Sequence, residues 1–487
     1  MVAAPVTLLS ARPSAAPRRK GLDDQLRLLL TSGGDERLWP DPLLRRNRYG
    51  APAAPAPDEL WYSSSTASAI SPEGWRAAGE ALERLLDPAA HCSPEDFVED
   101  IRARLLRLVG APGAQAALCA SGTEAELLVL FLALNLSRRP VVNIVVAPAE
   151  TGSGVPAAAD GRHFLGHASA GGPVSEGARL DGWEEASIQC RHIAVREPGG
   201  RLLPHAQVDA AAAEAVQAAA DAGAFTLLHV MDASKTGHAG VSRAAAQAIA
   251  ARHRDNVLVV VDACQLRCSW EVLRADLAAG FAVMITGSKF AGGPPFSGAL
   301  LLPAGLCERL ADVRPGQACL RAYSARLDWP APLRMALAER LRPGFNLGLA
   351  LRWTAALDAI EDYAALPEDH RGVLLARFDA AVRARVRADP ALSLLDEESL
   401  GVPGLVPVVH ADGSDARLIH ETLALPASGN VRPCHLGQPV EIGATAALRV
   451  CASMPLITRA AHDGFAVLED ELDEVFEAWA LARRACR

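Results

Sequence analysis

Short apolar runs alternate with longer helical patterns through the middle of this chain. This alternation is typical of parallel strands joined by crossover helices. The predicted strands are Ala116–Ala120, Val141–Ala147, Ala224–Met231, Val257–Asp262, Ala282–Thr286 and Ala299–Leu302. The predicted crossover helices are Glu124–Asn135, Val208–Ala222 and Arg243–His253. The order predicts an α/β domain built around a mostly parallel sheet that is flanked by helices.

The pattern changes on both sides of this region. The proline-dense stretch Ala51–Pro57 separates an N-terminal segment from the rest, and Ala331–Ala364 carries a long helical pattern that is broken near Pro343. Beyond it, helical segments mix with the strand candidates Leu405–His410 and Ala447–Cys451, as in a smaller α+β domain. We expect an N-terminal arm, a large domain and a small C-terminal domain, over residues 1–75, 76–320 and 321–487. We expect roughly the first 20 residues of the arm to be disordered.

The composition argues against nucleic-acid and membrane partners. The 487 residues carry a formal net charge of −9 without basic blocks, and no uninterrupted apolar stretch is long enough to span a bilayer. The ten cysteines form no Cys-x-x-Cys pair and have no histidines at zinc spacing, so we expect reduced thiols, no metal site and a cytoplasmic location. Small-molecule chemistry is the class of function that this composition favours.

Lysine is scarce in this chain. Only three of the 48 lysines and arginines are lysines, namely Lys20, Lys235 and Lys289. Arginine can replace lysine as a solvated charge, but its guanidinium keeps its proton and cannot form a Schiff base. Lys289 directly follows a predicted strand, in the segment Thr286-Gly287-Ser288-Lys289. It is therefore a candidate for covalent chemistry, with biased codon usage as the alternative reason for the scarcity.

Other polar residues also follow predicted strands, where open parallel sheets bind their ligands. Ser121-Gly122-Thr123 opens a helix whose free backbone amides could bind a phosphate, although the same pattern is an ordinary capping box. Asp262 ends the fourth predicted strand, and Gln265 follows it. A further polar segment, His229–Gly237, overlaps the end of the third predicted strand.

Taken together, these motifs resemble the fold-type I pyridoxal phosphate enzymes. The phosphate-type turn, the strand-end Asp262 with Gln265, and Lys289 at 27 positions after Asp262 (289 − 262) occur in the order of aminotransferase class V, which includes the cysteine desulfurases. The resemblance covers roughly residues 116–303 well and the C-terminal part loosely. It implies pyridoxal 5′-phosphate as cofactor, a seven-stranded type of large sheet, and a homodimer whose active sites lie between subunits.

The resemblance also implies roles for individual residues. Lys289 would hold the cofactor as an aldimine and then move the α-proton of an amino acid or amine, while Asp262 would keep the pyridine nitrogen protonated. The other expected cofactor contacts are Ser121, Gly122, Thr123, Thr151, Gln265, Thr286 and Ser288, with either Asp232 or Ser234. The expected substrate contacts are Arg449, Cys434 and His435. Thr151 stands where the family usually has a histidine or an aromatic residue, and Lys235 is either a substrate contact or an exposed residue.

The sequence leaves the reaction open. The leading hypothesis is an aminotransferase-like or lyase-like enzyme. The second is a cysteine desulfurase or C–S lyase in which Cys434 accepts sulfur and His435 lowers its pKa. A decarboxylase is the third, because Tyr62 and the run Ser63–Ser68 could line a substrate mouth. A non-catalytic role would fit a chain that lacked Lys289 or Asp262. Both residues are present in this chain.

Overall fold

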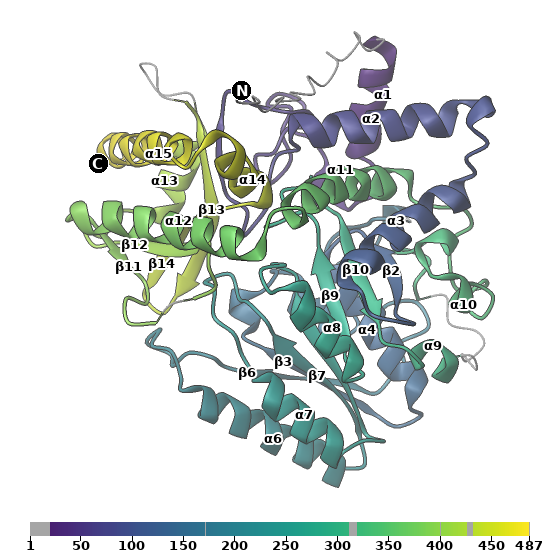
Figure 1. Ribbon diagram of the computed structural model, residues 1–487. Helices are drawn as coiled ribbons and strands as arrows, with labels where there is room; N and C mark the ends of the chain where they lie inside the picture. Colours follow the sequence, from purple (N-terminus) through teal and green to yellow (C-terminus); the bar gives the residue numbers. More distant parts are fainter. Residues whose placement is uncertain (1–19, 171, 311–318, 400, 426–431, 487) are drawn as a thin grey trace, which may run out of the picture.

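The computed structural model describes residues 20–170, 172–310, 319–399, 401–425 and 432–486 (Figure 1). The segment for which disorder was expected lies outside these ranges, apart from its last residue. Two main sheets organise the described chain, one of seven strands and one of five. None of the helices in the described ranges is both long enough and apolar enough to cross a membrane.

The large sheet confirms the predicted fold class. Only β10 runs antiparallel to its neighbours, and the other pairs of adjacent strands are parallel. In spatial order the strands are β2 (Gln115–Cys119), β10 (Gly298–Leu302), β9 (Ala282–Thr286), β8 (Val257–Ala263), β7 (Phe225–Met231), β3 (Val141–Val146) and β6 (Ile188–Ile193). The inner strands are almost wholly buried, because helices cover both faces of the sheet.

The helices divide between the two faces. One face packs against α4 (Gly122–Leu136), which is buried on nearly every side and is accordingly almost wholly apolar. The opposite face is covered by α3 (Pro94–Val109), α6 (His205–Asp221), α7 (Arg243–Arg252) and α8 (Trp270–Ala278). Short elements complete the large domain: α5 (Val155–Ala159), β4 (His167–Ala168), β5 (Gly172–Pro173), α9 (Leu306–Arg309) and α10 (Ala331–Arg334). The carboxyl ends of the parallel strands stay free to form a site.

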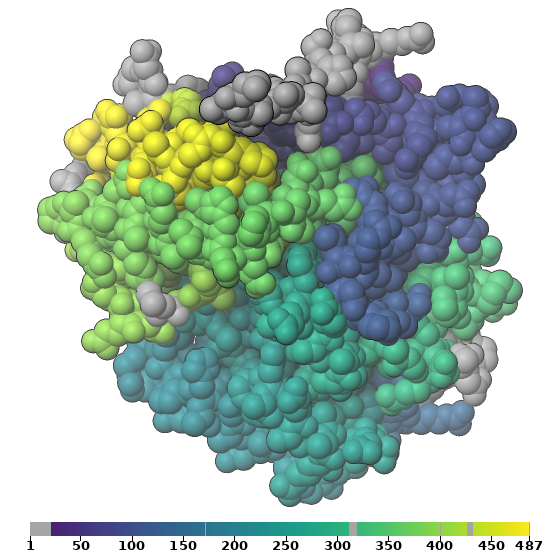
Figure 2. Space-filling model, viewed as in Figure 1, coloured from purple at the N-terminus to yellow at the C-terminus, as the bar shows by residue number. Residues whose placement is uncertain are grey.

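The small sheet includes a strand from the N-terminal segment. Its order is β1 (Leu60–Tyr62), β13 (Cys434–Ile442), β14 (Thr445–Cys451), β12 (Leu405–His410) and β11 (Leu392–Leu394). β1 pairs with β13 in parallel, and the other pairs of neighbours are antiparallel. The helices that accompany this sheet are α12 (Glu368–Ala388), α13 (Ala416–Leu423), α14 (Met454–Asp463) and α15 (Ala466–Ala485). Figure 2 shows this domain, green to yellow, packed against the teal large domain and the blue N-terminal helices.

The segment expected to form an arm is thus part of the body of the molecule. Besides β1, it supplies α1 (Lys20–Leu30), which packs against α2 (Pro72–Leu86) and α11 (Leu347–Ala364). Arg352 on α11 is fully buried, and its guanidinium donates hydrogen bonds to the carbonyls of Leu30, Ser32, Gly33 and Phe296 at 2.6–3.1 Å. These bonds satisfy carbonyls at and just beyond the end of α1, and they tie the N-terminal segment to the large domain.

α11 also supports the loop that carries Lys289. A Cβ atom at Gly287 would lie 2.6 Å from the Cβ of Ala356, and one at Gly293 would lie 2.5 Å from it. The indole of Trp353 donates to the carbonyl of Gly298 at 2.8 Å. Because only glycine lets the loop approach the helix this closely, the backbone around the lysine is held in place.

A buried ion cluster joins the small domain to the large one. Asp396, just after β11, accepts hydrogen bonds from both terminal nitrogens of Arg196 at 2.8 and 2.9 Å, and its Oδ2 lies 2.9 Å from Nε2 of His238. Burial by itself would raise the pKa of Asp396, but the bonds to Arg196 and His238 outweigh it and lower the pKa to about 2. The carboxylate therefore stabilises the fold above its ordinary pKa, and this contribution is lost as the pH falls towards 2.

We expect Asp396→Asn to lower the free energy of unfolding at pH 7 by about 1–3 kcal/mol, because Arg196 and His238 would lose the charge of Asp396 while Arg196 keeps its pair with Glu150. Urea denaturation should show this difference, and the gap between wild type and variant should shrink below about pH 3. Glu397→Gln is the matched control. Glu397 pairs with Arg387, and both side chains are about 60 % exposed, so this change should have little effect. Equal losses in the two variants would contradict the prediction.

Candidate active site

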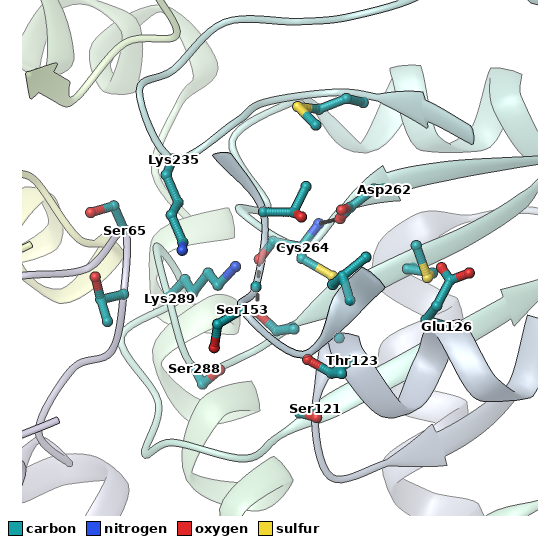
Figure 3. Close-up of a pocket in the computed structure, with 18 of the residues that line it drawn as sticks. Ser65, Ser121, Thr123, Glu126, Ser153, Lys235, Asp262, Cys264, Ser288 and Lys289 are labelled. Carbon is teal, nitrogen blue, oxygen red and sulfur yellow. Dashed lines mark hydrogen bonds between the residues drawn. The ribbon is translucent and has the colours of Figure 1, made fainter. Parts of the chain in front are cut away.

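A cavity of about 140 Å³ lies at the carboxyl ends of β7, β8 and β9, beside the first turn of α4 (Figure 3). Its position is the one expected for a ligand site in an open parallel sheet. The structure brings eight of the predicted residues together in its lining: Ser121, Gly122, Thr123, Thr151, Asp262, Thr286, Ser288 and Lys289. Within the described ranges, no group of three or more His, Cys, Asp and Glu side chains is arranged to hold a metal ion.

One end of the cavity suits a phosphate. Ser121 caps α4, and its hydroxyl oxygen accepts the backbone N–H of Glu124 at 3.2 Å. At Gly122 a Cβ atom would lie 2.6 Å from Sγ of Cys264, so a side chain there would require its neighbour to shift. The free amides and positive dipole end of this 15-residue helix face an area that Thr123 and Ser288 line with hydroxyls.

Lys289 and Asp262 lie in the cavity without ionic partners. Figure 3 shows the Lys289 side chain reaching across the cavity towards Cys264, with Asp262 beyond it. Oδ1 of Asp262 accepts the backbone N–H of Cys264 at 3.0 Å, which fixes the carboxylate at the end of β8. Among the described residues, neither side chain forms an ion pair. An amine and a carboxylate are therefore both available to a ligand in the cavity.

The structure corrects the expected contact at the end of β7. Met231 lines the cavity, and successive side chains of a strand face opposite sides of the sheet. Asp232 accordingly points to the other side, where its carboxylate pairs with Arg243 at 2.8 Å. Ser234 also lies away from the cavity, because its hydroxyl donates to Glu150 at 2.8 Å. Neither of the two predicted alternatives is among the lining residues.

Lys235, whose role the sequence left open, does line the cavity. Burial, together with the positive charges of Arg449 and Lys289, lowers the pKa of its amine to about 7, although the carboxylate of Glu150 opposes the shift. Its backbone N–H donates to the carbonyl of Glu150 at 2.9 Å, which directs the side chain inwards. The cavity therefore holds two lysines.

Arg449 lies behind the cavity wall and is fully buried on β14. Its Nε donates to the hydroxyl of Ser65 at 3.1 Å and its Nη2 to that of Thr66 at 2.6 Å, whereas the buried Nη1 has no hydrogen-bond partner among the described residues. Burial lowers the pKa of Arg449 to about 10, although Glu150 opposes the shift. Ser65 and Thr66 line the cavity, as expected for the Ser63–Ser68 run.

Two other predicted residues also stand behind this wall. Gln265 does not line the cavity. Its amide donates to the carbonyl of Ser65 at 3.0 Å, and its Oε1 is buried without a hydrogen-bond partner in the described part of the chain. Tyr62, expected near the mouth, is completely buried and donates its hydroxyl to Glu471 at 2.8 Å. Both residues support the wall and do not face a ligand in the cavity.

The structure does not bring Cys434 or His435 to the cavity. Cys434 is completely buried in the core of the small domain, and burial raises the pKa of its thiol well above the ordinary value. His435 stacks on Trp61 with ring centroids 3.8 Å apart, and its Nε2 lies 2.7 Å from Glu59. The expected substrate contacts at these positions are therefore replaced by packing between β13 and the N-terminal segment.

Several lining residues were not predicted as site residues. Arg37 and Tyr49 reach the cavity from the N-terminal segment, Phe296 from the loop after Lys289, and Gln438 from β13. No local pattern marks these four. Strand alternation could have found His229, because it lies on the same face of β7 as Met231.

His229 belongs to a buried polar cluster at the cavity. Its Nε2 lies 3.0 Å from Oδ1 of Asn143 and 3.3 Å from Oε1 of Glu126. Burial by itself would lower the pKa of His229, but the carboxylate of Glu126 outweighs burial and raises it. Figure 3 places Glu126 at the Asp262 side of the cavity. That side therefore holds two carboxylates, of which that of Glu126 faces His229.

Comparisons with known proteins give a fold and no close relative. No protein-family model matches the chain, and no curated protein matches it in sequence. Among solved structures, a NifS-like protein from Rickettsia africae matches with a TM-score of 0.53 and 11 % identity over 85 % of this chain and 99 % of that one. The cysteine desulfurase CsdA from Escherichia coli matches with a TM-score of 0.52 and 14 % identity, over 84 % of this chain and 95 % of that one.

A third match is the phosphoserine aminotransferase SerC from Cytophaga hutchinsonii, with a TM-score of 0.52 and 12 % identity over 86 % of this chain and 99 % of that one. At these identities the likeness concerns the fold alone. The matches extend over both domains, since each covers most of the two chains compared. The chain has the fold that its motifs predicted, that of the fold-type I pyridoxal phosphate enzymes.

Proposed function

We propose that this protein is a pyridoxal phosphate-dependent transferase or lyase that acts at the α-carbon of an amino acid or amine. The observation that carries the proposal is the meeting in one cavity of the N-terminus of a buried helix, the Lys289 amine and the Asp262 carboxylate, the last two without ion pairs to any residue that the structure describes. The names of the structural neighbours, a cysteine desulfurase and an aminotransferase, support the same chemistry.

The residues of the cavity fit this cofactor group by group. The first turn of α4, with Ser121, Thr123 and Ser288, would hold the phosphate. Asp262 would hold a proton on the pyridine nitrogen, and Lys289 would supply the amine that binds the aldehyde. When bound, the cofactor supplies an electron sink for the negative charge that develops at the α-carbon.

The remaining residues would position the substrate and move its proton. Arg449 backs the wall formed by Ser65 and Thr66, and its positive charge would favour a substrate carboxylate at these two hydroxyls. Lys289 would then take or return the α-proton as a general base or acid. Thr151, which lines the cavity beside Gly152, would cover the cofactor ring without aromatic stacking.

The buried thiol of Cys434 favours a reaction that does not use it as a sulfur acceptor. A thiol acts as a nucleophile in its thiolate form, and this one is enclosed in the core with a raised pKa. No observation in the cavity favours decarboxylation over the other reactions at the α-carbon. We also propose a homodimer, on the family resemblance alone.

Borohydride trapping tests the proposed function. We expect the purified protein to show a visible absorbance band after loading with pyridoxal phosphate, and borohydride to attach the cofactor permanently to the peptide containing Lys289. Peptide mass mapping identifies the labelled lysine. A protein that takes up no cofactor, or a label on Lys235 in place of Lys289, would overturn the assignment.

A further inference from the structure

We propose that the substrate of this site carries a second anionic group on its side chain, such as a carboxylate, and that Lys235 binds this group. The inference rests on the proposed function and specifies its substrate class: acidic amino acids or closely similar diacids. The inference depends on Lys235, a basic residue of the cavity to which cofactor binding assigns no role.

Lys235 has no anionic partner of its own. Its ammonium forms no hydrogen bond or ion pair among the described residues. The carboxylate that raises its pKa is that of Glu150, and this group is already engaged. Glu150 is buried, pairs with Arg196 at 2.7 Å, and accepts hydrogen bonds from the hydroxyls of Ser234 and Thr236. The charge of Glu150 is therefore shared with Arg196.

The other cations of the cavity have assigned or internal partners. Arg37 forms a two-pronged bond to Asp35, with Nε to Oδ1 at 2.9 Å and Nη2 to Oδ2 at 2.7 Å. Lys289 is the amine for the cofactor, and Arg449 is the expected partner of the α-carboxylate. When the cofactor and an α-carboxylate are both bound, Lys235 is therefore still without an anionic partner.

The cavity is also polarised. Figure 3 shows Asp262 and Glu126 on one side of Lys289, with Lys235 and Ser65 on the other. The side of Lys235 is backed by Arg449, since Ser65 and Thr66 both receive hydrogen bonds from that guanidinium. A ligand with two acidic groups would place both at the cationic side, away from the two carboxylates.

A neutral side chain would be poorly suited to this site. It would cover Lys235 and leave a desolvated amine without a partner, next to two further positive charges. A second anion would instead form a charge-assisted hydrogen bond, which is stronger in a site shielded from water. The site therefore favours substrates with a second acidic group over substrates with a neutral side chain, because a neutral side chain would leave the Lys235 amine without a partner.

Inert acids of matched length test this without any turnover. We would load the protein with cofactor and measure the binding of glutarate and pentanoate, which differ by one carboxylate, by isothermal titration calorimetry. We expect glutarate to bind at least about tenfold more tightly to the wild type. Lys235→Met should bring the two affinities within about threefold, and Lys235→Arg should keep most of the preference.

Lys20→Met, in the first residue of α1, is the matched lysine control and should behave as the wild type. Equal binding of the two acids by the loaded wild type would overturn the inference, whatever the variants do. So would a preference that persists in Lys235→Met, because another group would then bind the second carboxylate. If Lys235 contacted only the cofactor, Lys235→Met would load less cofactor and would keep the preference for glutarate over pentanoate. That result would also overturn the inference. Cofactor loading is measured first and tests the proposed function by itself.

Discussion

Lys289→Arg should abolish the visible band of the lysine-bound cofactor and lower turnover of a responsive amino acid by at least about a thousandfold. Arginine keeps the positive charge and much of the volume of the side chain, but its guanidinium neither binds the aldehyde nor gives up a proton at neutral pH. The phosphate end of the cavity is untouched by this change, so the variant should still bind the cofactor without a covalent bond. Absorbance spectra and single-turnover rates measure the two effects separately.

The control for this experiment is Lys20→Arg, which makes the same exchange at the first residue of α1 and should leave both readouts unchanged. Lys235→Arg is informative as well, because it alters the second lysine of the cavity and preserves Lys289. Retention of the visible band in Lys289→Arg, with borohydride labelling of Lys235, would show that the covalent role belongs to the other lysine.

Asp262→Asn is the second change with a large expected effect, a fall in turnover on the order of a hundredfold or more. Asparagine has nearly the same shape and can still accept the N–H of Cys264, so the end of β8 should keep its geometry. It carries no negative charge, however, and cannot keep the pyridine nitrogen protonated. Single-turnover rates and the absorbance spectrum of the loaded variant measure the consequence.

Asp232→Asn provides a matched control on the neighbouring strand. Asp232 follows Met231, which pairs with Asp262 across β7 and β8, but its carboxylate faces Arg243 on the opposite side of the sheet. We expect the control to lower stability and to leave the turnover of the folded, loaded protein near the wild-type rate. A loss of rate in Asp232→Asn without one in Asp262→Asn would mean that the aspartates were assigned the wrong roles.

Sequence patterns predicted the large sheet well because its inner strands are buried on both faces. The predicted strands Ala282–Thr286 and Leu405–His410 agree with β9 and β12 at both ends. β6 was not predicted, because only Ile188 and Ile193 of this edge strand are buried and the residues between them are partly or fully exposed. An edge strand with polar residues resembles a loop in sequence.

The site could be predicted where it depends on strand ends and not where it depends on distant segments. Thr123, Asp262 and Lys289 meet because the carboxyl ends of parallel strands converge. Cys434 was predicted as a substrate contact because a thiol can act as a nucleophile. It is instead the first residue of β13, and its side chain packs in the core of the small domain. Arg37 and Tyr49 could not be predicted, because tertiary packing alone brings them to the cavity.

The pairing of β1 with β13 also bears on how the chain folds. Glu59 and His435, bonded at 2.7 Å beside this pair, are 376 positions apart. At about 5–20 residues per second, roughly 20–75 s of synthesis separate them. The N-terminal segment that brings Arg37 and Tyr49 to the cavity must therefore wait for the last part of the chain. Such long-range closure favours slow folding, and β1 exposes its backbone hydrogen-bonding groups until β13 is made.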